Sequence, residues 1–418
     1  MSGKLLLKAM VLGTMTFSIY TIGIAAEVQD VNGLDSAQQT IASDTARKEA
    51  VRSSWMDRTD VVVGVGMKDS KETHSQHHYV GESSNRHDDL HTVTSKSLKS
   101  TEINKLYIET LQPITHYDEN AKSVVFVQGR IGRSGEKISS YKLDSYWEPA
   151  RPAGTFITHD KQTDKKESLG MNANIGIGYR RLSKGEHAYV GVNAFYDHVF
   201  KGGYKRVSGG VEYVAGLNEF HANLYRNLGT DDRKYTGLPG RTNRLGDPTG
   251  LYPYGMDPDQ SLYNYGVVSY ENHWMLSEKV AASGFDVGYS RTFKNARWAR
   301  VYADYYNWRG REAVRVGYHK LKKRDAIKGF KVGAEFHITP HLTLDAGYQT
   351  ASHHLSGPYA TLKYTIGTSK FAWHGGKHSE NAITTARSKM LDKVHRSDMV
   401  VQEVEEETYD HGVVDVGL

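Results

Sequence analysis

Histidines and carboxylates gather in one polar stretch of the sequence, where together they could hold a metal. The members of this cluster are His74, His77, His78, His87, Asp88, Asp89 and His91. Imidazole and carboxylate groups are ligands that zinc accepts. However, no pair of them is supported by a helical pattern, and the surrounding residues are rich in Ser, Asn and Lys. We therefore interpret the stretch as a solvated loop and expect neither a metal nor another cofactor.

A hydrolase would need a histidine beside a serine nucleophile or beside a carboxylate that holds a water. Asp197 and His198, at the end of a predicted strand, are the nearest candidates. The sequence contains no cysteine, which excludes thiolate metal sites, disulfides and cysteine nucleophiles. Gly64-x-Gly66 is not a nucleotide-binding loop, because no helix follows it. We expect that the protein is not an enzyme.

Two further segments could contact a partner. Tyrosines are concentrated between Leu251 and Tyr265, where they could bind a surface ligand or pack against neighbouring structure. The acidic run from Glu403 to Glu407 could hold calcium, but a solvated tail is the better interpretation. The formal net charge of +5 is too modest to indicate nucleic acid as a partner, and we expect none.

Apolar and polar residues alternate with a period of two through much of the sequence, most clearly over residues 190–197. One face carries Val190, Val192, Ala194 and Tyr196. The opposite face carries Gly191, Asn193 and Asp197, with Phe195 as the exception. Such alternation predicts a strand with one apolar and one polar face.

The same pattern predicts twelve strands, near residues 60–67, 104–115, 123–133, 170–182, 188–199, 205–215, 218–228, 284–293, 298–308, 328–339, 341–351 and 357–367. Short connections between them alternate with long ones at 68–103, 134–169, 229–283 and 309–327. Barrels of the bacterial outer membrane have short turns at one end and long loops at the other. The sequence therefore predicts an all-β fold, an antiparallel transmembrane β-barrel of about twelve strands over residues 58–375.

The polar strand faces should line the lumen of this barrel. The residues that we assign to the lumen are Arg180, Asn193, Glu212, Glu219, Asp286, Asp304, Glu335 and Asp345. In a soluble barrel the inward face would be the apolar one, whereas a water-filled or plugged lumen requires polar side chains, with the apolar set facing lipid.

Residues 376–398 are the candidate for a plug inside the lumen. Apolar residues recur there at helical spacings, and basic residues complement a lumen that is mainly acidic. The residues that we expect in the plug are Arg387, Lys389, Met390, Lys393, Val394 and Arg396. The apolar stripe of this short helix needs a partner, for which Phe195 and Tyr302 are candidates. A helix lying at the mouth of the barrel is the alternative.

Three stretches resemble consecutive strands of the inverse autotransporter β-domain found in the intimin and invasin family. They are Gly176-Ile177-Gly178-Tyr179-Arg180-Arg181, Gly191-Val192-Asn193-Ala194-Phe195-Tyr196-Asp197-His198 and Gly209-Gly210-Val211-Glu212-Tyr213. Residues 390–398 resemble the linker of that family, and residues 284–287 resemble the strand that follows its longest loop. The resemblance covers about residues 60–402.

This resemblance implies an outer-membrane barrel that carries a chain through its lumen and displays adhesive domains outside the cell. It implies outer-membrane lipid, the barrel-assembly machinery and periplasmic chaperones as partners, with a host-surface or cell-surface ligand for the displayed part. Only 22 residues, 397 to 418, follow Arg396, fewer than a folded domain needs. We expect residues 399–418 to be a short acidic tail and the surface loops to mediate any attachment.

Residues 1–26 have the features of a signal peptide, in which Lys4 and Lys8 precede an apolar run that ends at small residues. An uncleaved anchor helix is the alternative. Residues 27–57 are polar and are expected to form a short periplasmic lead. Beside export, a free-standing porin-like pore and an outer-membrane hydrolase stay open as functions. The linker-like segment favours export, because a simple pore needs none.

Overall fold

The computed structural model describes residues 54–80, 87–150, 155–228, 232–244, 267–309, 315–316, 319–320, 326–352, 356–367, 372–374 and 386–415. All of them belong to the second of two compact units, which begins at Arg47. Among these residues no helix has the length and apolar character needed to cross a membrane.

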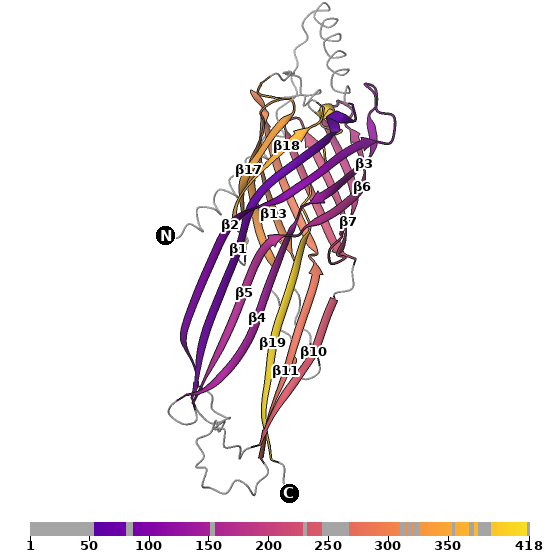
Figure 1. Cartoon of the computed structure of the whole chain (residues 1–418). Helices are drawn as coiled ribbons and strands as arrows, with labels where there is room; N and C mark the ends of the chain where they lie inside the picture. Colours follow the sequence, from indigo (N-terminus) through magenta and orange to yellow (C-terminus); the bar gives the residue numbers. More distant parts are fainter. Residues whose placement is uncertain are drawn as a thin grey trace, which may run out of the picture. The chain divides into compact units, whose positions relative to one another are not determined.

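Twelve of the described strands pair in one closed ring (Figure 1). In ring order they are β1 (Thr59–Val80), β2 (His87–Pro113), β3 (Ser123–Arg133), β6 (Met171–Leu182), β7 (Ala188–Val199), β8 (Lys205–Ala215), β9 (Asn218–Asn227), β12 (Gly284–Phe293), β13 (Ala296–Trp308), β16 (Ile327–His337), β17 (Leu342–Ala351) and β18 (Gly357–Thr365). All neighbours are antiparallel, and β18 returns to β1 with Asp60 opposite Thr365. The predicted twelve-stranded antiparallel barrel is confirmed.

The two faces of the ring strands differ as a membrane barrel requires. In β7, the Val192 side chain is 53% exposed, whereas that of Asn193, the next residue, is 9% exposed. Other large apolar side chains on the outside are Ile175, Ile177, Val211 and Leu224. Buried polar side chains on the inside include Arg180, Arg206, Glu212 and Asn223. An apolar outer surface around a polar interior is suited to lipid, so this ring is a transmembrane barrel.

Short turns join the strands at one end of the ring. The connection from β8 to β9 consists of Gly216 and Leu217, and Gly216 has a φ of +55°. Glycine adopts this left-handed conformation without the steric penalty that a side chain would bring. The turn from β6 to β7, residues 183–187, is closed by hydrogen bonds from Ser183 N to Ala188 O and from Glu186 N to Ser183 O. This end is called the short-turn end below.

At the other end, five further strands extend the same sheet beyond the ring (Figure 1). β1 and β2 have 22 and 27 residues, about twice the length that spans a bilayer. Beyond the ring β1 pairs with β5 (Thr155–Ser168), and the order then continues through β4 (Glu136–Ala150), β19 (Val400–Asp415), β11 (Val267–Ala281) and β10 (Asp232–Arg244). The pairing of β19 with β4 is parallel, and the others are antiparallel. Small elements complete the described chain: η1 (Met56–Arg58), β14 (Arg315–Val316) and β15 (His319–Lys320).

Several predicted loops are therefore strands. Much of 68–103, 134–169 and 229–283 belongs to β1, β2, β4, β5, β10 and β11, and the predicted acidic tail from residue 399 onward contains β19. The histidine-rich stretch, predicted to be a loop, lies mainly in β1 and β2. These strands extend beyond the bilayer, where no lipid contact requires either of their faces to be apolar. The period-two signal that identifies a membrane strand is therefore weak in them.

Candidate functional site: the threaded lumen

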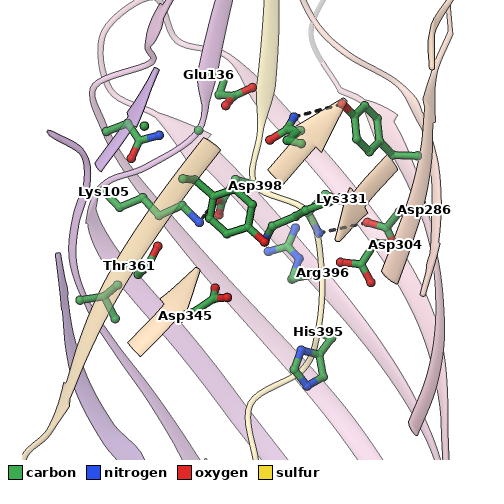
Figure 2. Close-up of a pocket in the computed structure, with 18 of the residues that line it drawn as sticks. Lys105, Glu136, Asp286, Asp304, Lys331, Asp345, Thr361, His395, Arg396 and Asp398 are labelled. Carbon is green, nitrogen blue, oxygen red and sulfur yellow. Dashed lines mark hydrogen bonds and ion pairs between the residues drawn. The ribbon is translucent and has the colours of Figure 1, made fainter. Parts of the chain in front are cut away.

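A linker, residues 386–399, runs through the barrel lumen and leads into β19. It begins with one helical turn at Ala386–Ser388 and continues as irregular and extended chain. Figure 2 shows His395, Arg396 and Asp398 of this linker among charged side chains of the wall. The predicted helix over 376–398 is wrong for residues 389–398, and residues 376–385 lie outside the described part of the chain.

Wall side chains take the hydrogen bonds that a longer helix would have made internally. Arg180 donates to the carbonyls of Met390 and Asp392 at 3.0 and 2.6 Å. The Val394 amide donates to Gln128 Oε1 at 2.9 Å. Because these backbone groups are satisfied by the wall, the linker loses little by leaving the helical conformation.

An apolar cluster holds the first half of the linker. Ala386, Met390 and Val394 are buried and lie four residues apart. They pack with wall residues Leu111, Val124, Phe126, Leu182, Tyr189, Phe195 and Val214. Of the two predicted partners, Phe195 belongs to this cluster, whereas Tyr302 lies elsewhere and donates to Asp345 Oδ1 at 2.5 Å. The helical spacing in the sequence thus reflects a shared apolar contact.

At the short-turn end, Arg387 is completely buried and ties the linker to two turns. Its guanidinium lies 3.0 Å from Glu186 in the β6–β7 turn and donates to Ala121 O at 2.9 Å in the β2–β3 turn. The Tyr117 hydroxyl of that second turn donates to Arg387 O at 3.4 Å. Burial raises the pKa of the Tyr117 phenol to about 12, further above neutral pH than its ordinary value, at which it already keeps the proton for this bond.

Further along, basic linker residues meet acidic wall residues. Lys389 contacts Glu219, and Lys393 contacts Asp60. Arg396 makes a bidentate pair with Asp197, at 2.7 and 2.6 Å, which is a strong and directional arrangement. The wall carboxylates come from β9, β1 and β7, so ion pairs join the linker to separate parts of the ring.

The last charged linker residue reverses this polarity. Asp398 lies 2.7 Å from Arg130 and 3.2 Å from Lys105. Sequence reasoning missed this pair because it treated the lumen as mainly acidic. The inward positions of β2 and β3 supply the two cations, and their alternation was a signal that could have identified them.

Several wall residues bind the linker backbone instead of its side chains. Arg206 is completely buried and donates to the carbonyls of Ser397 and Asp398 at 3.0 and 3.3 Å. Asn223 donates to His395 O at 3.0 Å. Every residue carries a backbone carbonyl, whatever its side chain. Contacts to carbonyl oxygens therefore allow this wall to hold an extended chain of varied sequence.

The predicted lumen residues fall into two groups. Arg180, Glu219 and Asp286 contact the linker; Asp286 Oδ2 accepts a hydrogen bond from Ser397 N at 3.0 Å. Glu212 does not touch the linker itself but accepts a hydrogen bond from Arg180 at 2.5 Å. Asn193 is buried on the same side, next to Gly210. The second group contacts other wall residues: Asp304 with His221, Glu335 with Arg300, and Asp345 with Tyr302. All six predicted plug residues contact the wall.

A cavity of about 260 Å³ lies beside the linker and is lined mainly by β13, β16–β18, β1 and β2. Its lining includes Lys105, Asp304, Lys331, Asp345, His395 and Arg396, all labelled in Figure 2. Cations and carboxylates alternate around it, so the space is polar and suited to water and small ions.

The residues considered for catalysis are not assembled into a site. The Asp197 carboxylate points into the lumen, where it is held by Arg206 and Arg396. The His198 ring instead stacks on Tyr196, on the opposite face of β7. Within the described side chains, no three His, Asp or Glu residues are placed to hold a metal. Of the predicted histidine cluster, only the His74 side chain is among those described. The other members of the cluster and the tyrosines of 251–265 lie outside them.

Comparison with known proteins gives one family match. The profile of the inverse autotransporter β-domain matches residues 155–398, more than half of the chain. A search of curated proteins gives no match.

Three solved structures resemble this chain at TM-scores below 0.5. The chain solved in "Unveiling the Mechanism Behind the in-meso Crystallization of Membrane Proteins" is 13% identical, with 83% of this chain and 100% of that chain covered and a TM-score of 0.44. The translocator domain of the autotransporter NalP from Neisseria meningitidis is 10% identical, with coverages of 79% and 97% and a TM-score of 0.23. A Pseudomonas aeruginosa FadL homologue is 10% identical, with coverages of 76% and 93% and a TM-score of 0.26.

Proposed function

Because the chain belongs to the inverse autotransporter β-domain family and is an outer-membrane translocator barrel, we propose that it carries its own C-terminal segment through the lumen and displays it at the cell surface. One observation carries the proposal: the linker enters at the short-turn end and leaves into β19 at the other end. Besides the ion pairs and the apolar cluster, the wall holds this linker through its backbone carbonyls, which suits a path that successive residues of a passing chain must share.

The proposed orientation follows from the lengths of the connections. The short-turn end faces the periplasm, and the sheet of β4, β5, β10, β11 and β19 stands outside the cell. Residues 1–26 act as the signal peptide for export across the inner membrane, and residues 27–57 form a periplasmic lead. Periplasmic chaperones and the barrel-assembly machinery then deliver and insert the barrel into outer-membrane lipid.

Attachment is the proposed use of the displayed part. The extramembrane sheet is built from strands of at least thirteen residues, which would carry the hairpin tips well clear of the bilayer. A ligand on a host or neighbouring cell is the partner that fits this position. The family resemblance to adhesins supports this role, and it needs no catalytic group.

Epitope tags in intact cells test the export proposal. A tag after Leu418 should be accessible to antibody and to added protease, whereas a tag inserted at Lys184 should become accessible only after the outer membrane is opened. A hidden C-terminal tag together with an exposed tag at Lys184 would invert the orientation and refute the proposal.

A free-standing pore is the second candidate, and the cavity beside the linker favours it. If conduction is the function, the full chain should pass ions steadily in planar bilayers and the C-terminal tag need not reach the surface. If export is the function, the full chain should be closed most of the time. The two measurements together separate the candidates.

A further inference from the structure

β19 fills a slot between two strands that otherwise have no partner on that side. Residues 400–406 pair in parallel with residues 136–142 of β4, and residues 401–415 pair antiparallel with residues 267–281 of β11. The other edge of β4 is paired with β5, and that of β11 with β10. Removing β19 would therefore expose two rows of unpaired backbone groups, which is unfavourable for strand edges.

The entrance of the slot is shaped for a polypeptide backbone. Glu136 N donates to Met399 O at 3.0 Å, and Ala282 N donates to Val400 O at 2.8 Å. Gly135 has a φ of +85°, and a Cβ atom at this position would lie 2.4 Å from Met399 O. A residue other than glycine would therefore force the incoming chain away from this edge.

Side chains on both faces seat the first residues of β19. Met399 and Val401 are buried with Leu169, Val199 and Ala281. On the opposite face, Val400 is buried in a second cluster that contains Tyr225, Ala282, Tyr306, Trp308 and Ile327. These two sets of contacts fix the register of the entering strand. A slip of one residue would exchange its two faces and place each side chain in the wrong cluster.

A polar contact completes the socket. Lys137 lies 2.6 Å from Glu167 and 3.4 Å from Glu403, and the Tyr204 hydroxyl donates to Glu403 at 3.0 Å. The Glu403 side chain is 12% exposed. Its two partners come from β4 and from the chain just before β8, so the carboxylate joins β19 to both the extramembrane sheet and the barrel rim.

We propose that the slot between β4 and β11 is a binding site for an extended polypeptide segment, and that residues 399–406 occupy it as a latch that holds the threaded linker in place. The inference rests on the proposed export of these residues. Withdrawal of the linker toward the periplasm requires both ladders of β19 to break first. The latch therefore favours the exported state without any input of energy from outside the barrel.

Because the chain has no cysteine, paired cysteines in the full-length protein test the slot directly. Val404 lies opposite Ser140 in the parallel pair, so Val404→Cys with Ser140→Cys should form a disulfide on mild oxidation of intact cells. Val404→Cys with Ser139→Cys is the matched control, since adjacent strand residues point to opposite faces. Equal cross-linking of both pairs, or of neither, would refute the register and the slot.

Single-channel recording of the full chain tests the latch. Val404→Pro removes a ladder donor in a central strand, whereas Val404→Thr keeps the donor and the shape. We expect Val404→Pro to open on the order of ten times more often than the Thr variant, as the loss of one buried hydrogen bond predicts. The oxidised 140–404 disulfide should suppress openings, and reduction of the same molecules should restore them.

These results separate the latch from the export proposal. If the C-terminal tag is hidden, export itself fails. If the tag is exposed but the disulfide leaves the opening frequency unchanged, only the latch fails. Should Val404→Pro not insert, as judged by loss of the faster migration of unheated barrel on gels, oxidation and reduction of the disulfide variant still decide the question.

Discussion

The two walls of the lumen meet the linker in different ways. β6–β9 alternate between exposed and buried side chains almost without interruption, and their inward residues contact the linker. β16–β18 have many partly exposed positions, and Glu335 of this wall pairs with Lys363 of the same wall and with Arg300 of β13. The linker therefore shares an apolar core with β2, β3 and β6–β8, whereas a cavity separates it from much of the wall formed by β16–β18.

This difference suggests a division of roles between the walls. Arg180, Arg206 and Asn223 on the packed wall bind backbone carbonyls and can guide a chain of any sequence. The open wall makes fewer contacts with the linker, and its cavity provides room for the side chains of a chain in transit. A barrel packed equally on all sides would hold its linker firmly but would leave no such room.

The largest expected effect comes from removing the linker altogether. A variant truncated after Gly376 should show single-channel conductance severalfold above that of the full chain, because the cavity would then extend to the packed wall. A variant truncated after Glu405 keeps the linker and serves as the control. Unchanged conductance after Gly376 truncation would mean that the linker does not obstruct the pore.

A charge placed on the lipid face should be the costliest single substitution. Val192→Arg, in the middle of β7, should lower the free energy of unfolding by about 2–4 kcal/mol. Gln349→Arg, which points into the cavity of the open wall, should cost much less because water can solvate it. Urea unfolding in lipid vesicles measures both, and equal costs would show that the inward and outward faces are wrongly assigned.

Breaking an ion pair should matter more on the packed wall than on the open one. Arg396→Met removes a bidentate partner of Asp197 and should cost about 1.5–3 kcal/mol. Lys363→Met removes a cation 3.6 Å from Glu335 and should cost at most about 1 kcal/mol, since its side chain is partly exposed and Glu335 keeps Arg300. Similar losses in the two variants would contradict the distinction between the walls.

Much of the barrel could be predicted from the sequence because the bilayer imposes a strict rule on each strand. In β7, the alternation of Val192 and Asn193 predicts which side chain meets lipid and which enters the lumen. Asp197 lies on the predicted inward face, and there it holds Arg396. The basic character of the linker likewise predicts attraction to wall carboxylates such as Glu219.

The extramembrane sheet and the linker's conformation could not be predicted in the same way. β19 contains the run Glu403–Glu407, which looks like a solvated tail because its partners, β4 and β11, are distant in sequence. Residues 389–398 turn and then run as irregular chain instead of a helix, because wall residues such as Arg180 and Gln128 satisfy their backbone groups. Both features depend on contacts between distant segments, which local periodicity does not contain.

The smallest expected effect concerns pH at the β19 socket. Burial alone would raise the pKa of Glu167, but its hydrogen bond and attraction to Lys137 outweigh burial, with smaller help from Lys68 and Lys165, and hold that pKa below its usual 4.5. A carboxyl with a depressed pKa stabilises the folded form above its unfolded pKa, and this contribution is lost as pH falls through the folded value. Acid should therefore release Lys137 from Glu167 and weaken the site beside Glu403.

Single-channel recording at outside pH 7 and pH 4 checks this expectation. Openings of the full chain should become about two to three times more frequent at pH 4, as expected for a partly exposed ion pair worth under 1 kcal/mol. Glu167→Gln cannot lose a charge, so its opening frequency should change less between the two pH values than that of the parent. An equal response to acid in the parent and in Glu167→Gln would assign the pH dependence to other groups and would leave Lys137 and Glu167 without a part in holding β19.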